Sequence, residues 1–545
     1  MKKIFCTFLL ITIVLFASSG QIPETVKPVK NVIVMLADGA SQGVISAARW
    51  YKMYNKMGNN LYLDPYFCGT VSSFCSNAPI GDSAPTMSCY MTGIPSLSSY
   101  VSLYPVADPE NDLVPIDPLM AYQPLATLLE AARIVQKKSV GIVATCEFPH
   151  ATPAACAAHH YDRGNYKHIA SQMVYNDLDV MFAGGARIIN DDMKTYFKTN
   201  GTNLIQDDIT TFRNYNGSEK VWALFEKMSM PNDLDRDPDK TPSLEEMTAK
   251  AIEHLSKNKN GFFLMVEGSK IDWAAHPNDA TGCITEFIAF DNAAGVALDF
   301  ARKNKETVVV ILADHCTGGL TIGRNGRANS SLSLEELFSA VSQYKKTAAG
   351  LESIIQDTQP NDIPAVFAKY TEIELSEKEL ENILHSMNYR IGEYAHIRTT
   401  GSLTNIIAEI MNQRTCFGFA SGTHTAEEVF LAVYHPSGIR PTGFVTNMQI
   451  NDYLCKAMGL KTSLPELNRK IFVNHKQALG DLKYEITEND DFPTLTVTNG
   501  NNTLTITAFS SMAMLNGKPV NLGSVTVYID KNKTFYFPAD ILKML

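Results

Sequence analysis

The stretch NVIVMLADG (residues 31–39) joins six consecutive apolar residues to an aspartate and a glycine. Three later stretches have the same form: SVGIVATCEFPH (139–150), NGFFLMVEG (260–268) and TVVVILADH (307–315). A continuous apolar run of this length is typical of a strand that is buried on both faces. The polar residues follow at the point where each strand ends. These four stretches therefore predict strands of a buried sheet.

Amphipathic stretches lie between the apolar runs, for example PSLEEMTAKAIEHLSKN (242–258) and ITEFIAFDNAAGVALDFARKN (284–304). Strands that alternate with helices predict an α/β protein, with a mostly parallel sheet covered by helices on both faces. In such folds the functional groups gather at the carboxyl ends of the strands. The polar residues at these strand ends are therefore the first candidates for a site.

Three regions depart from the alternation of strands and helices. Residues 1–20 carry two lysines, an apolar run and then small residues, which predicts a signal peptide and a periplasmic or secreted protein. Residues 328–414 read as capped helices with no strand between them, which predicts a helical insertion in a catalytic domain of residues 21–460. Residues 461–545 contain two hairpin patterns and predict a small β-rich C-terminal module.

Composition narrows the class of protein. The 545 residues are 45% hydrophobic and 19% charged, which indicates a large core rather than a disordered chain. The formal net charge of −10 argues against nucleic-acid binding, which needs basic patches. No stretch after the signal is long enough to span a bilayer. Cys68 and Cys75 are close enough in sequence to pair, although the cysteine count implies no compact disulfide scaffold.

The stretch GDSAPTMSCYMTG (81–93) places an acid and a serine side by side before small residues. Pro85 is tolerated in the first turn of a helix, and Gly93 is a natural helix end. Ser83 therefore lies at or next to the N-cap, where free backbone N–H groups attract anions. A simple N-cap serine is the alternative interpretation of this stretch.

Carboxylates and histidines recur at the predicted strand ends. Asp at a strand end often only caps a helix, and a helical pair such as Asp272 and His276 can be a surface contact. Their number at one end of the sheet is too large for caps alone, and together they suit metal binding. The residues concerned are Asp38, His150, Thr152, Glu267, Asp272, His276, Asp314, His315 and His424.

Six ordered motifs resemble the metal motifs of the alkaline phosphatases: DGA, DSA…TG, HATPAA…DRGNY, VEGSKIDWAAH, ADHCTGG and GTHTAEEV. The resemblance covers residues 30 to 440 apart from the helical insertion. It implies an α/β/α sandwich and a phosphomonoesterase that holds two Zn²⁺ and one Mg²⁺ per chain. It also implies broad use of small-molecule phosphate monoesters and a possible homodimer.

The resemblance assigns a role to each matching residue. Ser83 matches the nucleophile that forms a phosphoserine, and Arg163 matches the arginine that binds two phosphate oxygens. Asp272, His276 and His424 match the ligands of one zinc. The ligands of the other zinc are matched by Asp38, Asp314 and His315 together with Ser83. The magnesium ligands are matched by Asp38, Thr152 and Glu267.

Two positions depart from the best-known bacterial pattern of the family. His150 stands where those enzymes have an aspartate beside the magnesium, and Trp273 where they have a lysine that reaches phosphate. Because imidazole suits zinc better than magnesium, His150 predicts a third site that holds magnesium loosely and admits zinc. The alternative is that His150 only packs beside Trp273. His159 and His160 match no motif and are interpreted as structural.

Two other classes of function remain open at this point. A phosphodiesterase, phosphonate hydrolase or sulfatase shares the two-metal core, but the set of Thr152, Glu267 and Arg163 favours the monoesterase. A non-catalytic protein that sequesters zinc or phosphate is the other alternative. Loss of a nucleophile or ligand would indicate it, and none is missing.

Overall fold

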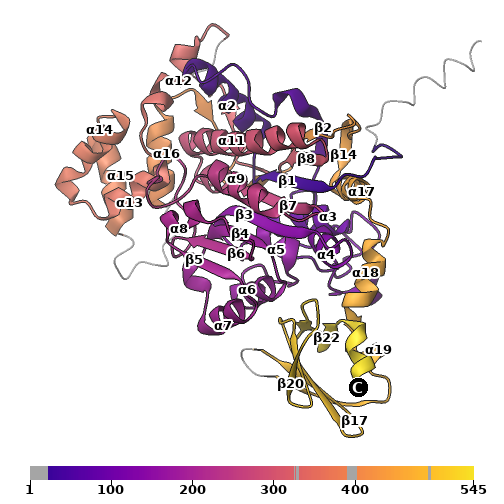
Figure 1. Ribbon diagram of the computed structural model, residues 1–545. Coiled ribbons are helices and arrows are strands. Elements are labelled where there is room, and N and C mark those ends of the chain that lie inside the picture. The colour runs from indigo at the N-terminus through magenta and orange to yellow at the C-terminus, as the bar shows by residue number, and fades with distance from the viewer. Residues whose placement is uncertain (1–21, 325, 327–329, 389–401, 489–491) are drawn as a thin grey trace, which may run out of the picture.

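A ten-stranded sheet forms the centre of the computed structural model, which describes residues 22–324, 326, 330–388, 402–488 and 492–545 (Figure 1). In sheet order the strands are β14 (Gly443–Thr446), β2 (Phe67–Ser72), β13 (Val429–Tyr434), β8 (Thr307–Leu312), β1 (Asn31–Ala37), β7 (Phe262–Gly268), β3 (Ser139–Glu147), β4 (Val180–Gly184), β6 (Val221–Phe225) and β5 (Asn203–Gln206). Within this sheet β13 alone runs antiparallel to its neighbours. The predicted strands at 31–37, 139–147, 262–268 and 307–312 are confirmed, and they lie side by side.

The register of the central strands brings their carboxyl ends together. β1 lies between β7 and β8, with Leu36 opposite both Glu267 and Leu312. On the other side of β7, Ala144 of β3 pairs with Glu267. The residues that follow these strands therefore emerge at one edge of the sheet.

Helices cover both faces of the sheet, as the sequence pattern predicts. One layer contains α2 (Gln42–Tyr54), α9 (Leu244–Leu255) and α11 (Ala280–Asn304). In this layer α11 packs against both α2 and α9, and α9 and α11 pack on the central strands. The other contains α3 (Ser83–Thr92), α4 (Leu128–Ile134), α5 (Ala151–Ala157) and α17 (Asn447–Met458) (Figure 1). Four further helices of this part of the chain are α6 (Tyr166–Tyr175), α7 (Asp191–Thr199), α8 (Ile209–Asn214) and α10 (Lys270–Ala275). The α/β/α class is therefore confirmed.

Between β10 (Thr321–Ile322) and β11 (Phe417–Gly418), the described residues form helices joined by turns and contain no strand. Its helices are α12 (Leu334–Gln343), α13 (Ala348–Gln356), α14 (Ile363–Thr371), α15 (Glu377–Asn388) and α16 (Leu403–Asn412). Ser333 and Ser402 begin α12 and α16 with reciprocal hydrogen bonds to the third helical residue, so the sequence defines these helix starts locally.

The C-terminal region begins with α18 (Leu464–Ile471) and α19 (His475–Ala478) and continues into two small antiparallel sheets. One sheet contains β15 (Val473–Asn474), β21 (Val527–Ile529) and β22 (Thr534–Phe537). The other contains β16 (Lys483–Thr487), β17 (Thr494–Asn499), β18 (Asn502–Thr507), β19 (Met512–Leu515) and β20 (Lys518–Asn521). Both predicted hairpins are confirmed as β17–β18 and β21–β22.

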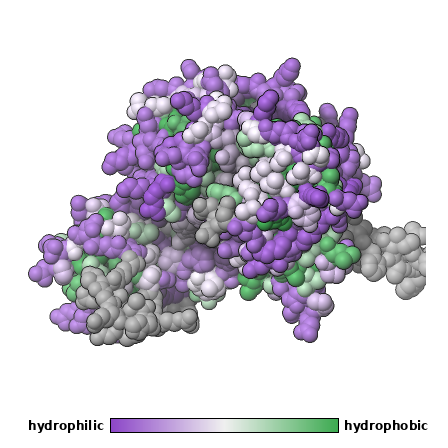
Figure 2. Space-filling view, turned by 90° about the horizontal axis from the view of Figure 1, so that it is seen from below, coloured by the Kyte–Doolittle hydropathy of each residue, from purple (hydrophilic) through white to green (hydrophobic). Residues whose placement is uncertain are grey.

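The surface, the helix lengths and the cysteines bear on further predictions from the sequence. The face seen in Figure 2, from the side of the C-terminal sheets, is mainly hydrophilic with small scattered hydrophobic patches. Within the described residues, no helix has the length and apolarity needed to cross a bilayer. The nine cysteines of the described ranges are all free, so the structure does not pair Cys68 with Cys75. The predicted signal peptide of residues 1–20 lies outside the described residues.

Candidate active site

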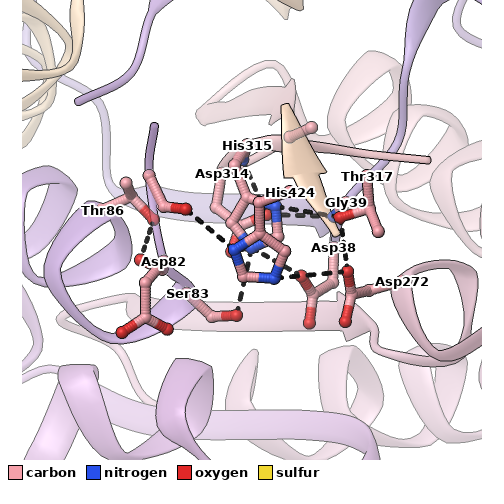
Figure 3. A network of polar contacts seen from close by, with 12 residues as sticks. Asp38, Gly39, Asp82, Ser83, Thr86, Asp272, Asp314, His315, Thr317 and His424 are labelled. Atoms are coloured by element: carbon pink, nitrogen blue, oxygen red, sulfur yellow. Dashed lines mark hydrogen bonds and ion pairs between the residues drawn. The ribbon is translucent and has the colours of Figure 1, made fainter. Parts of the chain in front are cut away.

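Ser83 is the first residue of α3, directly after its N-cap Asp82. Asp82 has an extended backbone, and Gly93 ends the helix with a φ of 80°. Ser83 is buried, and its Oγ lies 3.2 Å from Nε2 of His315. The predicted position of the serine next to the N-cap is confirmed, and the serine faces a histidine from the end of β8 (Figure 3).

Asp38 and Asp314 follow the neighbouring strands β1 and β8, so their fully buried carboxylates lie in one place. Oδ1 of Asp314 accepts hydrogen bonds from the backbone N–H groups of Gly39, at 3.1 Å, and His315, at 3.0 Å. Both oxygens of Asp38 and Oδ2 of Asp314 have no hydrogen-bond partner. Nε2 of His315 lies 3.5 Å from Asp38 and 3.4 Å from Asp314.

Burial, and then the negative charges of Asp314 and Asp272, raise the pKa of Asp38 well above its ordinary value. Buried carboxylates that accept no hydrogen bond are costly unless they are paired or coordinate a cation. The donor atoms of Asp38, Asp314 and His315 all lie within 4.8 Å of one another. This donor set therefore fits a divalent cation, and two carboxylates with one imidazole suit zinc.

Gly39 allows a further carboxylate to approach this cluster. Its φ is +67°, and a Cβ at this position would lie 2.6 Å from Oδ1 of Asp272 and 2.8 Å from Oγ1 of Thr317. Only glycine fits both the backbone conformation and the space. The glycine of the DGA motif thus has a structural reason at this site.

Asp272, His276 and His424 form the second part of the cluster. Nε2 of His276 lies 3.3 Å from Asp272, and Nε2 of His424 lies 3.9 Å from it. Nδ1 of each histidine faces a backbone carbonyl, that of Gly422 for His276 and that of Gly81 for His424. The carbonyls keep a proton on each Nδ1 and leave Nε2 as the ligand atom, which is the usual arrangement around zinc.

Within 4.8 Å, however, the donor atoms of Asp272 and His424 group with His315 rather than with His276. The rings of His315 and His424 stack with their centroids 3.8 Å apart. The hydrogen bond with Asp272 raises the pKa of His276 to about 9, against the effect of burial. A proton therefore holds His276 to Asp272 at the position where a cation could act.

Thr152 in α5 and Glu267 in β7 are the two further residues that the sequence assigns to magnesium. Both are fully buried, and Oγ1 of Thr152 and Oε1 of Glu267 have no hydrogen-bond partner. Burial raises the pKa of Glu267 to about 7, and the charge of Asp314 adds to this effect. Together with Asp38 they offer only oxygen atoms, the donor type that magnesium prefers.

Arg163 contacts Asp82 through one nitrogen of its guanidinium and His150 through another, the latter at 3.3 Å. The second oxygen of Asp82 accepts from the backbone of Ser99 at 2.7 Å. Although burial opposes it, the charge of Arg163 holds the pKa of Asp82 below its ordinary value. Asp82 therefore remains ionised and fixes the direction of the arginine.

His150 and Trp273 contact each other edge to face, with their ring centroids 5.5 Å apart. Nζ of Lys270 lies 3.8 Å from the centroid of the Trp273 ring and donates to Oγ of Ser229 at 2.8 Å. Burial and the charge of Arg163 lower the pKa of His150 to about 3. The imidazole is therefore neutral and accepts from Arg163, because a guanidinium can only donate.

Sequence reasoning gave no role to Asp82, Thr317 or Cys146. Oγ1 of Thr317 donates to Asp272 at 2.6 Å, and Sγ of Cys146 lies 3.4 Å from Oε2 of Glu267. For Asp82, the signal in the sequence is its place directly before Ser83. For Cys146, it is its place at the end of an apolar run that leads to His150.

The chain is similar to a known protein family and to solved structures. The family model described as alkaline phosphatase matches residues 29–460. Alkaline phosphatase 4 of Bacillus subtilis (strain 168) is 33% identical over 433 residues, which are 77% of this chain and 86% of that protein. The solved cold-active alkaline phosphatase of the psychrophile Shewanella sp. is 25% identical, with a TM-score of 0.67 over 78% of this chain and 99% of that one.

A second solved structure that resembles this chain contains a bound magnesium ion. It is a histidine-to-aspartate mutant of TAB5 alkaline phosphatase with magnesium bound in its M3 site. That chain is 25% identical to this one, with a TM-score of 0.54 over 80% of this chain and 99% of its own.

Proposed function

The chain belongs to the alkaline phosphatase family and is a phosphomonoesterase, and from this premise we propose that it hydrolyses monoesters through a phosphoserine on Ser83. The single observation that carries the proposal is the place of the Ser83 hydroxyl. It lies at a helix N-terminus, 3.2 Å from His315, beside buried carboxylates that have no hydrogen-bond partner. An anion attracted to that helix end meets the hydroxyl and the cation-binding residues at once.

We propose that three cations occupy this site. Asp272, His276 and His424 would hold one zinc. Asp38, Asp314, His315 and Ser83 would hold the other, and Asp38, Thr152 and Glu267 would hold magnesium. The unpartnered oxygens of Asp38, Asp314, Thr152 and Glu267 support this assignment. So do the backbone carbonyls that face Nδ1 of His276 and His424, because they leave Nε2 of each ring as the ligand atom. Bound divalent cations supply Lewis-acid stabilisation of the negative charge on the reacting oxygens.

The reaction of the chain's own residues has two displacements. Ser83 releases its hydroxyl proton to solvent and its oxygen attacks phosphorus, the bond to the ester oxygen breaks, and the leaving oxygen takes up a proton from solvent and departs as the alcohol. Water then attacks the phosphoserine, inorganic phosphate leaves, and Ser83 regains its proton. Arg163 donates two parallel hydrogen bonds to phosphoryl oxygens in both displacements, and Asp82 positions it.

His150 and Trp273 border the phosphoryl position in this proposal. The contact of His150 with Arg163 places it beside the bound phosphate, and Trp273 contacts the imidazole edge to face. Because the contacts proposed here involve the phosphoryl group, we propose that many small-molecule monoesters are accepted. Export through the signal of residues 1–20, a periplasmic or secreted location and a homodimer remain predictions.

The test compares two nitrophenyl esters at alkaline pH. Release of nitrophenol from the phosphate monoester, little release from the bis-ester, and loss of activity with EDTA support the proposal. Faster release from the bis-ester would instead indicate a phosphodiesterase. Full activity after EDTA treatment and dialysis would contradict the cation assignment.

A further inference from the structure

Glu267, one of the proposed magnesium residues, also belongs to a second group of possible ligands, together with the softer donors Cys146 and His150. Their donor atoms all lie within 4.8 Å of one another. Cys146 precedes the last residue of β3, and Glu267 lies on the neighbouring strand β7. Cys146 and Glu267 are fully buried, so the packing of two adjacent strands fixes the thiol against the carboxylate.

The polar atoms of this group are not satisfied by the protein. The Cys146 thiol donates to Oε2 of Glu267 at 3.4 Å, while Oε1 of Glu267 and Nδ1 of His150 are buried without a partner. Nε2 of the imidazole contacts Arg163 at 3.3 Å. A thiol, an imidazole and a carboxylate that converge with free valences match the donors of a tetrahedral zinc site with one position open.

We propose that Cys146, His150 and Glu267 form a site for a thiophilic divalent cation, with zinc as the natural occupant, and that zinc there competes with magnesium for Glu267. This inference rests on the proposed function because Glu267 is shared with the proposed magnesium set. Zinc takes the place of the thiol proton: the S–H bond breaks, a sulfur–zinc bond forms and one proton is released to solvent.

Occupancy of the site also affects Arg163. Whichever nitrogen of His150 binds the cation, the imidazole no longer offers a lone pair to the guanidinium. If Nε2 binds, the cation replaces Arg163, and if Nδ1 binds, the proton moves to Nε2 and faces a donor. The cation therefore releases Arg163 from His150 and leaves it held by Asp82 alone.

Cobalt serves as the probe because a cobalt–thiolate bond gives a charge-transfer absorption band in the near ultraviolet. The other two proposed zinc sites contain no cysteine, so they contribute no such band. Full-length protein is stripped with EDTA and titrated with Co²⁺ alone. We expect the band in the wild type, its complete loss in Cys146→Ser, and a lower apparent affinity for Co²⁺ in the presence of excess Mg²⁺.

Cys156→Ser is the matched control. Cys156 is also fully buried, but its thiol donates to the backbone carbonyl of Thr152 and belongs to no cluster of possible ligands among the described residues. This variant should keep the band. Absence of the band in the wild type, or its persistence in Cys146→Ser, would overturn the proposal.

A measurement on the wild type alone keeps the test valid if Cys146→Ser does not fold. Zinc-edge X-ray absorption of protein loaded with three equivalents of zinc should show a sulfur neighbour at about 2.3 Å. A spectrum with only nitrogen and oxygen neighbours would refute the site. A protein with this sulfur signal but no monoesterase activity would contradict the proposed function and leave the thiolate site intact.

Discussion

Two buried groups of histidine and carboxylate side chains differ in whether their polar atoms have hydrogen-bond partners. In the first, Glu130 and His159 are fully buried, and every polar atom of the pair has a partner. Glu130 accepts from His159 at 3.1 Å and from the backbone of Thr127 at 3.0 Å, and Nδ1 of His159 faces the carbonyl of Ser102. In the second, Asp38 is equally buried beside His315 and has no hydrogen-bond partner.

The electrostatics of the two groups differ in the same way. Burial alone would raise both carboxyl pKa values, but the charge of His159 and the hydrogen bonds hold the pKa of Glu130 below its ordinary value. At Asp38 the neighbouring carboxylates add to the effect of burial, and the pKa is raised. Unsatisfied donors and acceptors, rather than burial itself, therefore distinguish a site that needs a cation from a structural pair.

The largest expected effect is a loss of activity without a loss of stability, at Ser83 beside the group of Asp38 and His315. Ser83→Ala should lower turnover by at least about a thousandfold, because the group that forms the covalent intermediate is lost. The melting temperature should remain near that of the wild type. Turnover of nitrophenyl phosphate, and acid-quench trapping of labelled phosphate on the protein, measure this effect.

Ser88→Ala in the same helix is the control, because Oγ of Ser88 accepts from the backbone of Ser102 at 2.8 Å and lies outside the cluster. This variant should lose stability, by about 1–3 kcal/mol, and still trap phosphate. Labelled phosphate trapped on the Ser83→Ala protein would show that another residue is the nucleophile.

A substitution in the pair of Glu130 and His159 should lower stability and leave activity unchanged. Glu130→Gln removes the charge that faces His159, and breaking a buried pair costs about 3–5 kcal/mol of unfolding free energy. The kcat/KM of the folded protein should remain within twofold of the wild type. Urea unfolding, together with activity measured below the transition, tests both statements.

Asp38→Asn provides the matched substitution in the unsatisfied group. In metal-stripped protein it removes a buried charge that repels Asp314 and Asp272, so stability should rise while cation binding falls. If Glu130→Gln and Asp38→Asn destabilise the protein equally, the two groups do not differ in how well the protein satisfies their carboxylates.

Arg163→Ala should have a smaller effect on the reaction than the loss of Ser83. The loss of two charge-assisted hydrogen bonds to phosphate should cost about 2–4 kcal/mol in kcat/KM, with weaker inhibition by phosphate and unchanged zinc content. Arg213→Ala, which removes an exposed pair with Glu246, should change neither quantity. Unchanged kcat/KM and phosphate inhibition in Arg163→Ala would place the arginine outside the site.

Much of the fold follows from local sequence because the signals are local. The apolar run at 31–37 is long enough to identify a buried strand, and Pro85 and Gly93 delimit α3. The order of the ten strands and the reversed direction of β13 depend on pairing between distant segments, so the sequence pattern could not predict them.

The residues of the site likewise fall into those that local sequence identifies and those whose role depends on distant partners. The candidate ligands were found because each directly follows an apolar run or lies in a short motif. The roles of Asp82 and Cys146 depend on partners more than eighty residues away, Arg163 and Glu267, and one sequence contains no record of such contacts. The interpretation of His159 as structural agrees with its two hydrogen-bond partners.

The smallest expected effect concerns the stability of metal-stripped protein as the pH changes. Burial, together with the charge of Asp314, raises the pKa of Glu267 from 4.5 to about 7. Between these values the folded protein binds more protons than the unfolded chain, so its stability falls as the pH rises through this range.

Urea unfolding of EDTA-treated wild type and Glu267→Gln at pH 5 and pH 8 isolates this contribution. Asp38 and His276 also have raised pKa values and lose stability in the same direction, so only the difference between the two proteins reports on Glu267. The wild type should lose more stability than Glu267→Gln, and zinc and magnesium should remove most of the difference because cations neutralise the carboxylate. Equal losses in the two proteins would show that Glu267 is already neutralised by the protein, as Glu130 is by His159, and would remove it from the group that needs a cation.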